Sequence, residues 1–147
     1  MISYKKWLID DLQSLERMRF AITQMQQELE TVEAEYAAIK ATNYDKMPSG
    51  SGDNLQEEKL LTAIAKKDEL TANLRYTEKH VSDMERLLAQ LPDDERRIIE
   101  RTVIGKEKYA TASLAEELGY EQAHIYRLKN RALMHLAQLR HGASYQP

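Results

Sequence analysis

Residues 3–42 form a stretch without glycine or proline in which apolar side chains recur every three to four positions. The pattern follows two heptad rows, Leu8, Leu15, Ile22, Leu29 and Tyr36 in one row and Asp11, Met18, Met25, Val32 and Ile39 in the other. A sustained period of about 3.5 residues is typical of a helix that packs along a narrow seam, and not of a helix on a broad globular core. The sequence therefore predicts one long supercoiled helix from Ser3 to about Thr42.

A second stretch without glycine or proline, Asn54 to Leu91, has a weaker heptad because Lys67 and Thr77 stand in otherwise apolar rows. Those rows are Leu60, Leu74, Val81 and Leu88, and Ala63, Leu70, Met84 and Leu91. The stretch is predicted to form a second long helix.

Residues 43–53 separate the two stretches and are predicted to form a loop, because Pro48 and two nearby glycines cannot continue a helix. We expect Asp53 to be the N-cap of the second helix, since its side chain can accept hydrogen bonds from the first amides. Two helices joined by a short loop predict an antiparallel hairpin, a coiled coil over residues 1–90. The apolar rows are satisfied either within this hairpin or by self-association. A hairpin alone has a thin core, so we expect a homodimer or larger assembly.

The composition leaves little material for a large compact core, because charged residues make up 31% of the chain and there is one Phe and one Trp. Without Cys, neither a disulfide framework nor a thiolate metal site is expected. No apolar run approaches the roughly 20 residues that a membrane helix needs. Charged residues interrupt the N-terminal segment, so no cleavable signal peptide is expected. These features predict a soluble cytoplasmic protein of one or two small domains that binds no membrane.

Pro92 opens a third part, residues 91–142, which is predicted to contain three helices. The carboxylates at residues 93–95 follow the proline in a first helical turn, where they meet the positive end of the helix dipole. That helix ends near Gly105, and a polar connection at residues 106–111 leads to the next helix.

A helix-turn-helix follows, with Ser113 to Leu118 as its first helix and Glu121 to about Leu139 as its second. Gly119 suits the turn because glycine adopts a positive φ without a Cβ clash. One stripe of the second helix is apolar: Ile125, Leu128, Ala132, Leu136 and Leu139. Residues 143–147 are expected to be a flexible tail.

The second helix of this pair and the residues after it carry no acid. From residue 122 to 147 there is no carboxylate, but there are four basic residues: Arg127, Lys129, Arg131 and Arg140. Acids outnumber bases in residues 1–90, which argues against general polyanion binding and for one local basic surface. A DNA duplex repels acids and attracts such a surface, so the pattern indicates DNA binding.

Two segments, LPDDERRII at residues 91–99 and SLAEELGYEQAHIYRLKNRALMHL at residues 113–136, carry a family pattern. They resemble region four of bacterial sigma factors and the regulators that share its fold. The structural positions of that family fall on Leu91, Pro92, Ala115, Leu118, Gly119, Ile125, Ala132, Leu133 and Leu136. The connection from Gly105 to Ala112 is slightly longer than in typical sigma factors, which departs from the family's pattern.

The layout of the whole chain adds a narrower resemblance. A long coiled part precedes a Lys-Met-Pro-x-Gly segment at residues 46–50 and a module with His-Ile-Tyr-Arg-Leu at residues 124–128. This layout is similar to the ArpU/RinA group, which are small phage and prophage transcriptional regulators of Gram-positive bacteria. The resemblance implies a sequence-specific DNA-binding regulator in the bacterial cytoplasm, an activator of late phage genes such as those for packaging and lysis.

The candidate DNA-binding residues lie on the second helix of the helix-turn-helix, whose N-terminal turns are expected in the major groove. They are Gln122, Ala123, His124, Tyr126, Arg127, Lys129, Asn130 and Arg131. Arg127 could pair with guanine, and Gln122 or Asn130 with adenine, because these side chains match the hydrogen-bonding edges of those bases. His124 and the remaining basic side chains are better suited to phosphates, which fix register without reading sequence.

Each assignment has a structural alternative. Arg127 and Lys129 could form a solvated helix face, Tyr126 could pack over the module's own first helix, and Gln122 could simply start the helix. The histidines have no metal-ligand spacing, so neither a metal site nor a cofactor is expected.

Catalytic motifs are missing from the sequence, which has no Gly-rich phosphate loop, no His-Glu-x-x-His and no Gly-x-Ser-x-Gly. We therefore expect no enzyme. The main alternative function is protein interaction, in which the helical rod docks onto RNA polymerase or a phage partner without specific DNA binding. The two functions differ in salt response, because only contacts to several phosphates weaken steeply as salt rises.

Overall fold

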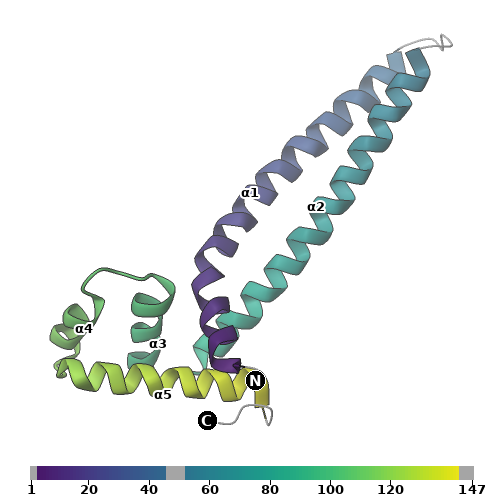
Figure 1. Ribbon diagram of the computed structural model, residues 1–147. Coiled ribbons are helices and arrows are strands. Elements are labelled where there is room, and N and C mark those ends of the chain that lie inside the picture. The colour runs from purple at the N-terminus through teal and green to yellow at the C-terminus, as the bar shows by residue number, and fades with distance from the viewer. Residues whose placement is uncertain (1–2, 46–51, 143–147) are drawn as a thin grey trace. The chain divides into compact units, whose positions relative to one another are not determined.

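The computed structural model describes residues 3–45 and 52–142, and every regular element in these ranges is helical (Figure 1). In chain order the elements are α1 (Tyr4–Asp45), α2 (Gly52–Ala89), α3 (Asp93–Ile99), η1 (Glu100–Ile104), α4 (Ala110–Leu118) and α5 (Gln122–His141). The prediction of an all-α chain is confirmed for the described residues. None of these described helices is long and apolar enough to cross a membrane. The Lys-Met-Pro-x-Gly segment at residues 46–50 and the predicted tail at residues 143–147 lie outside the described residues.

The helices on either side of the predicted loop extend further into it than the sequence indicated. α1 continues to Asp45 and α2 begins at Gly52, so both ends of the range 43–53 are helical. Asp53 therefore lies inside α2, and its prediction as the N-cap is wrong. The first amides of a helix have no intrahelical partner, so a glycine is tolerated at the helix start. Each residue added after the first turn forms one more backbone hydrogen bond, which favours extension of the helix into the predicted loop.

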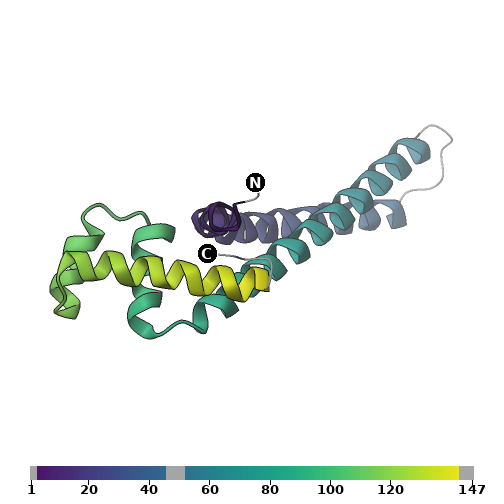
Figure 2. The same cartoon turned by 60° about the horizontal axis from the view of Figure 1, so that its bottom comes forward.

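The chain divides into two compact units, of which one is Phe20–Lys79 and the other joins Met1–Arg19 to His80–Pro147. Within the unit Phe20–Lys79, α1 and α2 run side by side in opposite directions (Figure 2). Few side chains on their facing surfaces leave solvent completely: the buried apolar residues described in this unit are Val32, Ala63 and Leu74. The other described positions of the heptad rows in this unit are only half-buried.

Charged side chains flank the seam of the unit Phe20–Lys79. Lys66 Nζ lies 3.6 Å from Glu28 Oε1, and Lys67 Nζ lies 3.9 Å from Glu33 Oε1. The Lys67 ammonium is also 5.9 Å from the centroid of the Tyr36 ring. An ammonium group over an aromatic face is attracted by the ring. This contact explains how a lysine occupies a heptad position that sequence periodicity reserves for an apolar side chain.

In the other unit, α3, α4 and α5 enclose a small globular core. Its buried cluster consists of Ile98, Leu114, Ala115, Ile125 and Leu128, with Leu118 packed against it. The helix that begins with α3 changes to π-helical hydrogen bonding in η1 and ends as predicted near Gly105, whose amide donates to the Glu100 carbonyl over 2.8 Å. Such a bulge lets the chain leave the helix with an extra residue in its last turn.

The C-terminal end of α5 contacts the N-terminal turns of α1 and the end of α2. Arg140 forms an ion pair with Asp11 over 2.9 Å and donates a hydrogen bond to Met84 Sδ over 3.3 Å. The rings of Tyr4 and His141 lie 4.7 Å apart. Asp11 interrupts the first heptad, and its pairing with Arg140 accounts for a carboxylate at that position.

Candidate nucleic-acid interface

The turn between α4 and α5 fixes where α5 begins. Gly119 adopts the predicted left-handed conformation, with φ 72° and ψ 29°. The following amide, that of Tyr120, donates to the Ala115 carbonyl over 2.9 Å. Glu121 is extended and precedes the first helical residue, Gln122. The left-handed residue lets the amides after α4 donate to the Ala115 carbonyl, and it reverses the chain within a few residues.

The start of α4 differs from the sequence prediction. The helix begins at Ala110 instead of Ser113, because the Tyr109 carbonyl already accepts a hydrogen bond from the Ser113 amide over 3.0 Å. Tyr109 itself has a positive φ of 64°, as does Lys106 with 47°. The polar connection before α4 is therefore shorter than predicted and contains two residues in the left-handed region.

The apolar stripe of α5 faces the core along most of its length. Ile125, Leu128, Ala132 and Leu136 are buried as predicted, whereas Leu139 is 45% exposed. Buried positions on α5 also include Leu133, which lies outside the stripe but is a structural position of the sigma-like pattern, and Ala137, which the sequence did not select. The helix packs against two surfaces in succession, the α3–α4 core and then the ends of α1 and α2, so its buried side widens beyond one stripe.

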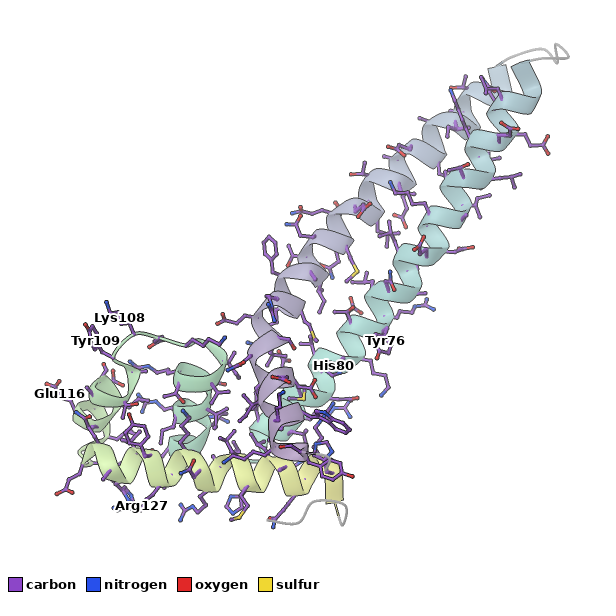
Figure 3. All side chains as sticks on the ribbon, in the orientation of Figure 1. Tyr76, His80, Lys108, Tyr109, Glu116 and Arg127 are labelled. Carbon is purple, nitrogen blue, oxygen red and sulfur yellow. The ribbon has the colours of Figure 1, made fainter. Side chains whose placement is uncertain are left out.

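The predicted DNA-binding residues lie mostly on the outward side of α5. Six of them are exposed: Gln122, Ala123, Tyr126, Arg127, Asn130 and Arg131. His124 and Lys129 are half-buried at the two edges of this surface. Figure 3 shows the Arg127 side chain directed away from α4 and α3. The outward side thus combines amide, phenol and guanidinium groups and contains no carboxylate.

One edge of the outward side is held to α3 through Tyr120. The Tyr120 hydroxyl donates to Asp94 Oδ2 over 2.9 Å, and this hydrogen bond, with the charge of Asp94, raises the pKa of Tyr120 above its ordinary value of 10.0. The Tyr120 ring meets the His124 ring edge to face, with centroids 4.7 Å apart. His124 Nδ1 in turn lies 3.5 Å from Arg127 Nη2. This chain of contacts fixes the first turn of α5 relative to α3.

Arg131 has a structural partner that the sequence did not reveal. Its Nε donates to Glu95 Oε1 over 2.7 Å, and His135 Nδ1 lies 3.3 Å from Glu95 Oε2. Glu95 was predicted only as one of three carboxylates in a first helical turn, and it is 1% exposed. The Arg131 side chain is 55% exposed, so a phosphate contact would have to use its other guanidinium nitrogens. The spacing of Arg131 and His135 by four residues, which places both side chains on one face of α5, was the one sequence signal that they could contact the same carboxylate.

The other edge of the outward side borders a groove of about 470 Å³. Gln122, Tyr126 and Lys129 line it on the α5 side, opposite the connection and the first turn of α4. Tyr126 therefore faces a groove and remains 53% exposed, instead of packing fully over the first helix of the module. Sequence reasoning missed the residues of the connection that form the opposite wall.

These side chains provide hydrogen-bond donors and positive charge for an anionic or base-edge ligand, and no assembled catalytic group. The described residues contain no cluster of three or more His, Cys, Asp or Glu that could hold a metal ion. Comparison with known proteins finds no matching family model, no matching curated protein and no matching solved structure.

Proposed function

We propose that the chain is a sequence-specific DNA-binding transcriptional regulator that places the first half of α5 in the major groove. One observation carries this proposal: Gln122, Tyr126, Arg127 and Asn130 are exposed together on a helix surface without a carboxylate. Their side chains suit the hydrogen-bonding edges of bases in the major groove. The Gly119 turn and the Tyr120 contacts support it further, because they hold this surface in one orientation.

The resemblance to sigma region four gives the proposal its finer form. A helix over residues 93–104, a second helix α4 and a third helix α5 around one core are what such a module requires. On this proposal α4 and α5 are the helix-turn-helix, and α1 and α2 are a coiled-coil hairpin. The similarity to the ArpU/RinA group then points to an activator of late phage genes, for packaging or lysis, in the bacterial cytoplasm.

Self-association through residues 20–79 forms the second part of the proposal. The seam of this unit leaves most of its described apolar heptad positions half-exposed, and a second copy of the chain could cover them. A homodimer would present two copies of α5, which compensates for the few basic residues on each one. Sedimentation that shows a monomer at micromolar concentration would contradict this part alone.

A protein-docking function is the competing proposal, and the exposed apolar side chains of the rod favour it. Phe20, Leu61 and Tyr76 are large side chains that remain more than half exposed in the unit Phe20–Lys79. RNA polymerase or a phage protein could bind there while α5 contacts no DNA. Binding to DNA that weakens steeply with salt supports the regulator, whereas salt-insensitive protein binding without retained DNA supports the competing proposal.

The decisive experiment starts with capture of fragmented host and prophage DNA by the purified full chain, followed by sequencing. Arg127→Ala is then tested on the recovered sequence and is expected to weaken binding by about 1–3 kcal/mol, the scale of a single bidentate hydrogen-bonded pair with a base. Gln138→Ala is the matched control, because it changes an exposed polar residue further along the same helix. Equal affinities of the two variants and the wild type would remove the assignment of α5.

A further inference from the structure

The connection that precedes α4 forms one wall of the groove beside α5. Lys106, Glu107 and Tyr109 line this wall, and Gln122, Tyr126 and Lys129 line the opposite one. The α5 residues are among the DNA contacts predicted from the sequence, whereas the connection is not part of that predicted interface. A ligand that lies along this edge of α5 would meet both walls of the groove.

The groove carries positive charge because two lysines and one carboxylate line it, and that carboxylate is paired with an arginine. Glu107 Oε2 lies 2.9 Å from Arg101 Nε, and this hydrogen bond is the main reason that the pKa of Arg101 is raised. Among the described residues, no carboxylate lies within ion-pair distance of Lys106, Lys108 or Lys129. These three ammonium groups are therefore available to an external anion.

The backbone of the connection holds its side chains outward at some conformational cost. Lys106 and Tyr109 both have positive φ, which glycine adopts freely and other residues adopt rarely. Tyr109 is 74% exposed, and the Lys108 ammonium lies 5.3 Å from the centroid of its ring (Figure 3). Residues held in sparsely populated backbone regions cluster at binding and switch segments.

We propose that residues 105–109 form a second DNA-contacting element, which binds phosphates of one strand while α5 lies in the major groove. The ligand is the phosphodiester backbone of the duplex, because ammonium and phenol groups donate to phosphate oxygens without reading bases. This inference rests on DNA binding by α5. It also explains how a helix with few basic residues gains affinity, since the connection adds Lys106 and Lys108 to the contact surface.

The test is the full-length double variant Lys106→Gln/Lys108→Gln, titrated against a mixed-sequence duplex of about 30 base pairs at several salt concentrations. Log affinity decreases with log salt, and the steepness of this decrease is expected to drop by about one for each phosphate that the variant no longer binds. The affinity for the duplex recovered by DNA capture should weaken to a similar extent. Lys5→Gln/Lys6→Gln is the matched control, because it removes two exposed lysines near the start of α1. The control is expected to keep the wild-type slope.

Each other outcome overturns a defined part of the inference. If the connection variant matches the control while Arg127→Ala weakens binding, residues 105–109 contact no DNA and the function proposed for α5 stands. If the wild type shows no salt-dependent binding to any duplex, both proposals fail. If single-stranded DNA of the same sequence binds more tightly, and the connection variant loses that binding, the duplex assignment is wrong. Circular dichroism checks folding, and Lys106→Gly/Lys108→Gln, which suits the positive φ, replaces a variant that unfolds.

Discussion

The unit Phe20–Lys79 and the module at residues 91–142 are both helical, but they bury their apolar residues to different extents. In the described part of the first, three apolar side chains are buried, and the remaining heptad positions are half-exposed. In the second, three helices enclose Ile98, Leu114 and Ile125 completely. Two helices side by side shield only the surfaces that face each other, whereas a third helix closes a core. Apolar periodicity therefore predicts the helices of both regions, but it does not distinguish the region with a closed core from the region without one.

Truncation of a leucine in each region gives the largest expected contrast. Leu114→Ala removes a side chain that has no exposed surface, so it should lower the free energy of unfolding by about 2–5 kcal/mol. Leu70→Ala removes a half-buried side chain and should cost less than about 1.5 kcal/mol at low protein concentration. Urea denaturation of both variants measures the difference. Equal losses would show that the apolar seam of the unit Phe20–Lys79 is already shielded from water in solution.

The two regions should also differ in the value of an ion pair. Arg131→Met leaves the buried Glu95 carboxylate with only His135 beside it, and we expect a loss of about 2–3 kcal/mol. Lys66→Met breaks a pair with Glu28 that is half-exposed on both sides, and its loss should stay below about 1 kcal/mol.

A double-mutant cycle tests the cause of the larger loss. Glu95→Gln removes the buried charge, so Arg131→Met should cost much less in that background. An unchanged cost would mean that packing of the Arg131 side chain, and not the carboxylate of Glu95, stabilises the module.

Much of the architecture followed from local signals. Heptad periodicity predicted both long helices, Pro92 with its three carboxylates predicted the start of α3, and Gly119 predicted the left-handed turn. These features depend on residues close together in the sequence, so spacing and residue type were sufficient. Boundaries were less accurate, as the positions of Asp53 and Ala110 show, because helix ends depend on hydrogen bonds that sequence periodicity does not register.

The remaining features depend on contacts between distant residues. Glu95 is buried only because α5 brings Arg131 and His135 to it, and Asp11 is tolerated in a heptad because Arg140 reaches it. The groove beside α5 arises from a connection whose sequence suggested only polarity. The exposure of the predicted DNA-binding residues is a structural observation, but their contact with DNA remains a prediction.

A substitution at the α4–α5 turn has a smaller expected effect than Leu114→Ala or Arg131→Met. Gly119→Ala places a Cβ where no atom lies within 4 Å, so its cost comes from the positive φ alone and should be about 1 kcal/mol. Gly119→Asn should cost less, because asparagine tolerates the left-handed region better than alanine. Thermal unfolding of the two variants orders them. An Ala variant as stable as the wild type would show that the turn can relax, and the fixed start of α5 would then need another cause.

The smallest expected effect is a pH dependence at the C-terminal end of α5, where the module contacts α1. Burial is the main cause that lowers the pKa of His141 below its ordinary value of 6.5; Arg140 lowers it further, and Asp11 partly opposes both. His141 Nε2 is buried and has no hydrogen-bond partner among the described residues, and the ring lies against Tyr4. Because the unfolded chain takes up this proton at a higher pH than the folded chain, the contribution of His141 to stability is present above 6.5 and is lost as pH falls below that value.

His141→Phe keeps an aromatic ring beside Tyr4 but removes the titration. The free energy of unfolding of the wild type should therefore fall more steeply than that of the variant between neutral pH and about pH 5. Urea denaturation across this range measures the free energy of unfolding of both proteins. The titration of the carboxylates contributes equally to both, so it drops out of the difference. Parallel pH profiles would mean that the His141 side chain is hydrated in solution. The buried part of α5, which includes Leu136, would then not extend as far as His141.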